Sequence, residues 1–161
     1  MSGTVQPSPE SVILEAVTAA LAEWARSQGG KAQSAEDPQH AIDQIIRDTS
    51  NGLTASVFWG SDNVSGESGM ESEALMDGVI NVIMSRPITA ELDKAKAIRR
   101  TLDLCHELRQ VVTGIDRNGV QWLQNSPRYR GKSPMAITEG KLINGYLLRF
   151  NVLYLRGDPG E

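Results

Sequence analysis

The chain has 161 residues, 40% of them hydrophobic and 5% aromatic, which fits one globular domain over residues 1–161 with a single core. Its apolar runs are only a few residues long, and residues 1–9 contain neither a basic residue nor an apolar stretch, so we expect no membrane helix and no secretory signal. The formal net charge is −4, and the single cysteine and two histidines exclude a disulfide framework and zinc sites of the usual spacing.

The first 60 residues predict two helices and one strand. A flexible, polar segment over residues 1–8 precedes a helix from Pro9 to Gln28, because apolar residues recur there at three- and four-residue spacing. A second helix is predicted from Pro38, after a capping aspartate, to near Asn51. Residues 53–59 alternate apolar side chains with smaller or polar ones, which is the pattern of a half-buried strand.

The middle of the chain predicts a loop, a strand and the longest helix. Residues 60–73 are polar and rich in glycine, which indicates a long surface loop. Residues 75–84 form the second predicted strand, which Pro87 ends. Thr89 caps a helix that runs to Gly114. Its buried stripe is expected to consist of Leu92, Ala95, Ile98, Leu102, Cys105, Leu108 and Val112.

The last part of the chain predicts three more strands. After an Asn-Gly turn, residues 120–123 form the first of them, and residues 125–135 form a second long surface loop, which is basic. Residues 146–155 alternate strictly, so one face of this strand is apolar. Residues 136–143 are expected to pair with it as a hairpin around Asn144-Gly145.

Together these elements predict the fold class. Helices separated by antiparallel hairpins, without a regular alternation of strand and helix, are typical of α+β proteins. We therefore expect a mostly antiparallel β-sheet of about four to five strands with the helices packed on one face.

The sequence predicts no enzyme and no cofactor. Gly131-Lys132-Ser133 matches the end of a phosphate-binding loop, but Ser126 stands where that motif needs its first glycine. The Gly-x-Ser-x-Gly motif of serine hydrolases does not occur. Cys105 and His106 are neighbours on a helix, so their side chains diverge by about 100° and do not form a nucleophile–base pair.

Three groups of charged residues are candidate contact surfaces. An acidic group lies in and just after the first predicted loop, and because it lacks the spacing of a calcium loop it indicates a solvated or docking surface rather than a metal site. A basic group lies in the second predicted loop around Tyr129, and another covers the exposed face of the long helix. Their members are Glu67, Glu71, Glu73 and Asp77; Arg128, Arg130 and Lys132; and Lys94, Lys96, Arg99 and Arg100.

The charges divide along the chain. Residues 1–91 carry four basic and 13 acidic side chains, and residues 92–161 carry 12 basic and seven acidic ones. Such a division suits a nucleic-acid surface or head-to-tail packing of copies, unless the two halves mix in space and cancel. The acidic pI, near 5.2, favours protein contact or solvation over nucleic acid for the basic loop.

The chain resembles the tail-terminator (tail-completion) and minor tail proteins of long-tailed bacteriophages. The resemblance covers most of the chain as a pattern. It is carried by the amphipathic segment Ser11–Val17, the strand Ser56–Trp59, the mid-chain helix and the closing segment Gly145–Tyr154.

This resemblance implies a structural virion protein of the tail, assembled in the host cytoplasm. Such a protein forms a homo-oligomeric ring, usually a hexamer, at the head-proximal end of the tail tube, where it stops tube polymerisation. Its implied partners are further copies of itself, the tail tube protein and the head connector or head-completion protein, with DNA only passing through the lumen. Two alternatives remain open: a head-completion or neck protein of the same virion, and a monomeric α+β ligand-binding domain with an apolar pocket.

Overall fold

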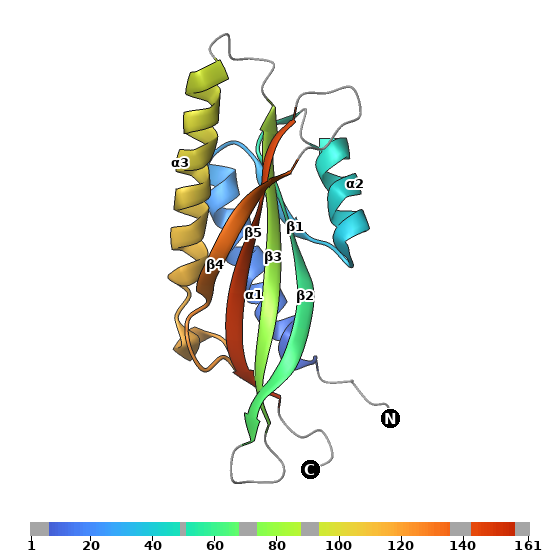
Figure 1. The fold of residues 1–161 in the computed structure, drawn as a ribbon, viewed down its shortest axis with the longest axis vertical. Helices are drawn as coiled ribbons and strands as arrows, with labels where there is room; N and C mark the ends of the chain where they lie inside the picture. Colours follow the sequence, from blue (N-terminus) through green and yellow to red (C-terminus); the bar gives the residue numbers. More distant parts are fainter. Residues whose placement is uncertain (1–6, 49–50, 68–73, 88–93, 136–142, 157–161) are drawn as a thin grey trace.

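The fold is an α+β arrangement of three helices and five strands within the described part of the chain (Figure 1). A computed structural model describes residues 7–48, 51–67, 74–87, 94–135 and 143–156. The elements in chain order are α1 (Pro9–Ser27), β1 (Lys31–Ser34), α2 (Pro38–Asp48), β2 (Thr54–Glu67), β3 (Ala74–Pro87), α3 (Lys94–Thr113), the short 3-10 helix η2 (Arg117–Gly119), β4 (Arg128–Met135) and β5 (Ile143–Leu155).

The five strands form one sheet in the order β1-β2-β3-β5-β4. Only the β1–β2 pair is parallel, and the other three pairs are antiparallel. The predicted fold class, a mostly antiparallel sheet of four to five strands with helices, is therefore confirmed. The order leaves β1 and β4 as the two edge strands of the sheet.

Helix α1 forms where the sequence predicts it. Ser8 caps its N-terminus by accepting a hydrogen bond from the backbone amide of Ser11 at 3.1 Å, and Pro9 supplies the fixed φ that suits a first turn. The chain leaves the helix at Gly29, whose φ of +74° favours glycine. One face of the helix is buried against the sheet through Ile13, Val17, Leu21 and Ala25.

The main core lies between α1, α3 and one face of the sheet. Alternate residues of each strand point into it, as the two-residue period of a strand requires. Those from β5 are the predicted apolar face, apart from Tyr146, which is half-buried. The fully buried strand side chains of this core include Ala55 and Val57 of β2, Ile80, Val82 and Met84 of β3, and Leu148, Phe150, Val152 and Tyr154 of β5.

Helix α2 packs on the opposite face of the sheet, where Ala41 and Ile45 form a second small core with Phe58 of β2 and Ile83 of β3. The expectation that all helices share one face was therefore wrong in this detail. The reason is visible in β3, where Val82, Ile83 and Met84 are consecutive buried residues, because a strand covered on both faces is apolar on both.

The prediction of a surface loop over residues 60–73 was wrong for the first part of that range. Strand β2 continues to Glu67 and stays paired with β3, with irregularities between Trp59 and Ser61 and between Val64 and Gly66. Polar residues tolerate this extension because Ser61 to Val64 are exposed, beyond the end of the main core. Residues 68–73 lie outside the described part of the chain.

The second predicted loop was also wrong, because residues 128–135 form edge strand β4, paired antiparallel with β5. The strand predicted over residues 120–123 is a turn with a single bridge from Leu123 to Tyr154. Trp122 there has a φ of 76°, a left-handed conformation that is incompatible with a regular strand.

The predicted hairpin turn at Asn144-Gly145 lies inside β5, which runs unbroken from Ile143. A Cβ on Gly145 would approach the carbonyl oxygen of Met84 to 3.3 Å, so this glycine allows close strand packing rather than a turn. Residues 136–142, most of the predicted partner segment, lie outside the described residues. The short strand β1 was not predicted.

Candidate interaction surfaces

The face of helix α3 that packs on the sheet differs from the face predicted from the sequence. Its buried residues are Ala97, Thr101, Leu104, Cys105, Leu108 and Val112. Of the expected stripe, Cys105, Leu108 and Val112 are confirmed, whereas Ala95, Ile98 and Leu102 are exposed and Leu92 lies outside the described residues. The sequence contains two apolar stripes on this helix, and spacing alone does not decide which one faces the sheet.

Helix α3 carries two large apolar side chains on its surface. Ile98 is 48% exposed and Leu102 36%, and they are four residues apart, so they are neighbours on one side of the helix. Arg109, further along the same side, lies over the ring of Tyr129 of β4, with its guanidinium carbon 4.3 Å from the ring centroid. The side that carries Ile98 and Leu102 is therefore the side next to the β4 edge.

The predicted basic residues of α3 lie on its exposed surface. Lys96, Arg99 and Arg100 are all exposed, whereas Lys94 begins the helix and its side chain is not described. Arg86, at the end of β3, joins them, and its guanidinium donates a hydrogen bond to the carbonyl oxygen of Ala97 at 3.5 Å. Burial and the nearby charge of Arg100 lower the pKa of Arg86, so two cations lie close together here. No sequence pattern had pointed to Arg86 as part of this basic surface.

The basic residues of β4 do not form one cluster. By the strand register, Lys132 pairs with buried Leu148 and lies on the α3 face, where its charge acts on Cys105. Arg128 pairs with Asn151 and lies on the other face. There it lines a cavity of about 100 Å³ together with Asp77. Arg130 sits at an irregularity of the strand and is exposed.

The predicted acidic group is only partly described. Glu67 is the last residue of β2 and its side chain is not described, and Glu71 and Glu73 lie outside the described residues. Asp77 lies on β3 and lines the cavity with Arg128. The Oδ1 atom of Asn151 in the same cavity is buried and accepts no hydrogen bond from the described residues.

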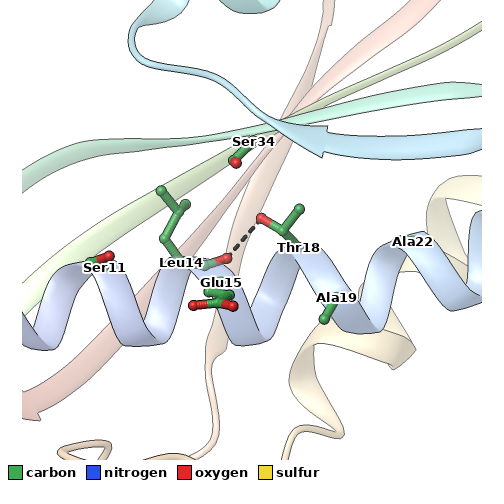
Figure 2. Close-up of a pocket in the computed structure, with 7 residues that line it drawn as sticks. All are labelled: Ser11, Leu14, Glu15, Thr18, Ala19, Ala22 and Ser34. Atoms are coloured by element: carbon green, nitrogen blue, oxygen red, sulfur yellow. Dashed lines mark hydrogen bonds between the residues drawn. The ribbon is translucent and has the colours of Figure 1, made fainter. Parts of the chain in front are cut away.

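A groove runs along the other edge of the sheet, between α1 and β1 (Figure 2). It has a cavity volume of about 460 Å³ and is open to solvent along the helix. Figure 2 shows Ser34 of β1 facing α1 across the groove, where the hydroxyl of Thr18 is held by the carbonyl oxygen of Leu14 at 2.7 Å. Small residues line the rest, among them Ala19 and Ala22, with Glu15 as the charged member.

A buried polar network holds β1 in place beside this groove. Gln44 of α2 donates to the carbonyl oxygen of Ser34 at 3.0 Å and accepts from the hydroxyl of Ser56 of β2 at 2.9 Å. Asp48 accepts from Gln33 of β1 at 3.0 Å. The network therefore fixes a strand of only four residues between α2 and the rest of the sheet.

The two sheet edges carry opposite charge. Residues 9–48, which contain α1, β1 and α2, have seven acidic and three basic side chains. Residues 94–135, which contain α3 and β4, have nine basic and three acidic ones. Helices α1 and α2 pack mainly on the β1–β2 side of the sheet and α3 mainly on β5, while α1 and α3 also contact each other on one face. The charge division of the sequence is therefore carried into space chiefly at the two edges (Figure 1).

Other kinds of site find little support in the described residues. Over these ranges no three His, Cys, Asp or Glu side chains gather closely enough to hold a metal ion. In the same ranges no helix combines the length and apolar character that crossing a membrane requires. A comparison with protein-family models and with curated proteins found no match to this chain.

Proposed function

We propose that this chain is a structural protein of a phage virion, a tail terminator whose copies form a ring at the head-proximal end of the tail tube. The observation that carries the proposal is the opposite charge of the two edges of one sheet. An acidic edge and a basic edge on opposite sides of a molecule attract each other only between different copies.

Contacts between unlike surfaces are heterologous. Such contacts close into a ring when a whole number of the rotations from one copy to the next adds up to 360°. Otherwise the copies continue as a filament. A terminator must close, because it ends a tube rather than extending it. The resemblance to tail terminators implies six copies, and the charge arrangement is compatible with that number without setting it.

The basic surface of α3 has two uses in such a ring. The side with Ile98 and Leu102 suits contact with a neighbouring copy, because such a contact would remove their exposed apolar surface from water. Cationic residues that do not meet a neighbour, such as Lys96, suit a lumen through which DNA passes. The further partners in this proposal are the tail tube protein and the head connector or head-completion protein.

Tail tubes provide the direct test of this function. Purified tube protein is polymerised with and without this chain, and tube length and tube ends are measured by electron microscopy. The proposal expects shorter tubes, each with a ring at one end. Tubes of unchanged length with bare ends would overturn it. A chain that instead binds isolated head connectors would be assigned to the head-completion or neck position.

A further inference from the structure

No side chain of the described residues fills the groove between α1 and β1. It lies beside an edge strand, is about 460 Å³ in volume and is lined mainly by small side chains, with Leu14 as the larger apolar one. Small residues leave room for an apolar side chain from outside. Glu15 at its rim, with Glu36 and Asp37 beyond the end of β1, makes its surroundings acidic.

The opposite edge carries a matching feature. Ile98 and Leu102 project from α3 among cationic residues, with Arg99 beside Ile98 in the chain and Arg109 further along the same side. An apolar pair flanked by Arg99 and Arg109 complements a small-residue groove that carries Glu15, because burial supplies affinity and the charges supply orientation.

Pairing between edge strands is the competing way for two copies to meet. Strand β4 is protected against it by an irregularity between Tyr129 and Gly131, by the charges of Arg130 and Lys132, and by Pro134, which has no amide hydrogen to donate. Strand β1 has only four residues to offer. Contact through side chains of α3 is therefore favoured over an extended sheet.

We infer that the α1–β1 groove of one copy receives Ile98 and Leu102 from α3 of the next copy. This inference rests on the proposed assembly of copies into a ring and names the two surfaces that meet. It assigns the partner of the groove as a second copy of this chain, bound head to tail, so that each copy uses both of its edges.

Site-directed cross-linking tests the inference. One copy carries Ser34→Cys, a nearly isosteric change in the groove, and a second, mass-labelled copy carries Ile98→Cys. Both positions are exposed, so the variants are expected to fold. Treatment of the mixture with a short bismaleimide is expected to link the two variants, while either variant alone forms no linked dimer. The native Cys105 is buried and does not compete.

Matched controls use the same helices. Asp103→Cys is exposed on α3 but points away from the Ile98 side, and Glu23→Cys is exposed on α1 outside the groove. Replacing either partner by its control is expected to abolish the hetero-linked product.

Each other outcome has a definite meaning. Linked dimers of Ile98→Cys alone would show that two α3 helices face each other and would overturn the inference. Protection of the Ile98→Cys thiol from a maleimide by added tail tube protein, with no link to the groove, would also overturn it. If light scattering shows oligomers but the pair does not link, the inference fails while the ring proposal stands on another surface. If the protein is monomeric and remains so on tail tubes, both fail.

Discussion

Asp48 is a residue whose environment differs strongly from that of a surface carboxylate. Its side chain is 8% exposed, pairs with Lys31 at 3.0 Å and accepts from Arg47 at 2.9 Å and from Gln33 at 3.0 Å. The hydrogen bond from Arg47, with further donors from Lys31 and Gln33, holds the pKa of Asp48 well below its usual range. The carboxylate therefore stabilises the junction of α2 and β1 in its charged form.

Replacing Asp48 by Asn is expected to lower the free energy of unfolding by about 1–3 kcal/mol at neutral pH, because the donors lose a charged acceptor. Since the folded pKa is depressed, this stabilisation is present above the unfolded pKa and is lost as pH falls through the folded value. Urea denaturation should therefore show the difference between wild type and variant shrinking in acid. Asp43→Asn, exposed on the same helix, is the control. A difference that grows in acid would contradict this account.

The pKa of Cys105 is shifted upward, in the opposite direction to that of Asp48. Burial raises the pKa of its thiol to about 11, against a smaller lowering by Lys132, so the reactive thiolate is scarce at neutral pH. A thiol reagent at about pH 8 is expected to label native Cys105 far more slowly than the unfolded chain. In the dissociated protein, where residue 98 is exposed, the Ile98→Cys variant should gain one rapidly labelled thiol. Equal labelling of native and unfolded wild type would show that the thiol is not buried.

At the scale of elements, an aromatic pair joins β2 and β5 across a glycine of the intervening strand β3. Trp59 of β2 meets Tyr154 of β5 edge-on, with ring centroids 5.6 Å apart, and both rings pass over Gly78 of β3. The Tyr154 hydroxyl donates to Glu10 of α1 at 2.8 Å, which ties the first turn of the helix to the sheet.

A methyl group at residue 78 is expected to be costly. A Cβ there would lie 2.5 Å from Trp59 Cζ2 and 3.2 Å from Tyr154 Cε1, so the rings must shift. Gly78→Ala should therefore lower the free energy of unfolding by about 1–3 kcal/mol, measured by denaturant titration. Gly119→Ala, where a Cβ meets nothing within 4 Å, is the control. Equal stability of the two variants would contradict the packing described for the aromatic pair.

The sequence predicts correctly those helices whose start, end and apolar face are all set by residues within or next to the helix itself. Helices α1 and α2 were predicted because caps, prolines and apolar spacing agree within each segment. Strand β4 and the extension of β2 were missed because polar, glycine-containing segments become strands here only by pairing with β5 and β3. The face of α3 was wrong because Ala95, Ile98 and Leu102 mimic a core stripe.

At the scale of the whole molecule, the division of charge along the chain was visible in the sequence, but the position of the two charged halves in the fold was not. Whether acidic and basic halves cancel depends on which strands become edges, and the crossover that places β5 between β3 and β4 is a long-range property. The groove likewise joins Ser34 to residues of α1 and has no sequence signature. The candidate basic residues on α3 could be predicted, whereas the surface that complements them could not.

Reversing Arg99 and Arg100 together to Glu is expected to weaken assembly, because the charge opposite the acidic edge is removed. The fold should survive, since both side chains are exposed and Arg100 lies near the like charge of Arg86. Sedimentation velocity measures the oligomer and thermal unfolding measures the fold. Arg26→Glu with Arg149→Glu changes the net charge equally at exposed positions outside α3 and β4. Assembly equal to that of wild type would remove this face of α3 from the interface.

The central claim is that unlike edges of neighbouring copies meet. Light scattering over a concentration series, at low and high salt, tests it most directly because it measures the number of copies per particle. The account predicts a fixed, ring-sized mass that is reached at low salt and decreases at high salt, as exposed charges are screened. A monomer at every concentration and salt, with no binding to added tail tubes, would contradict it.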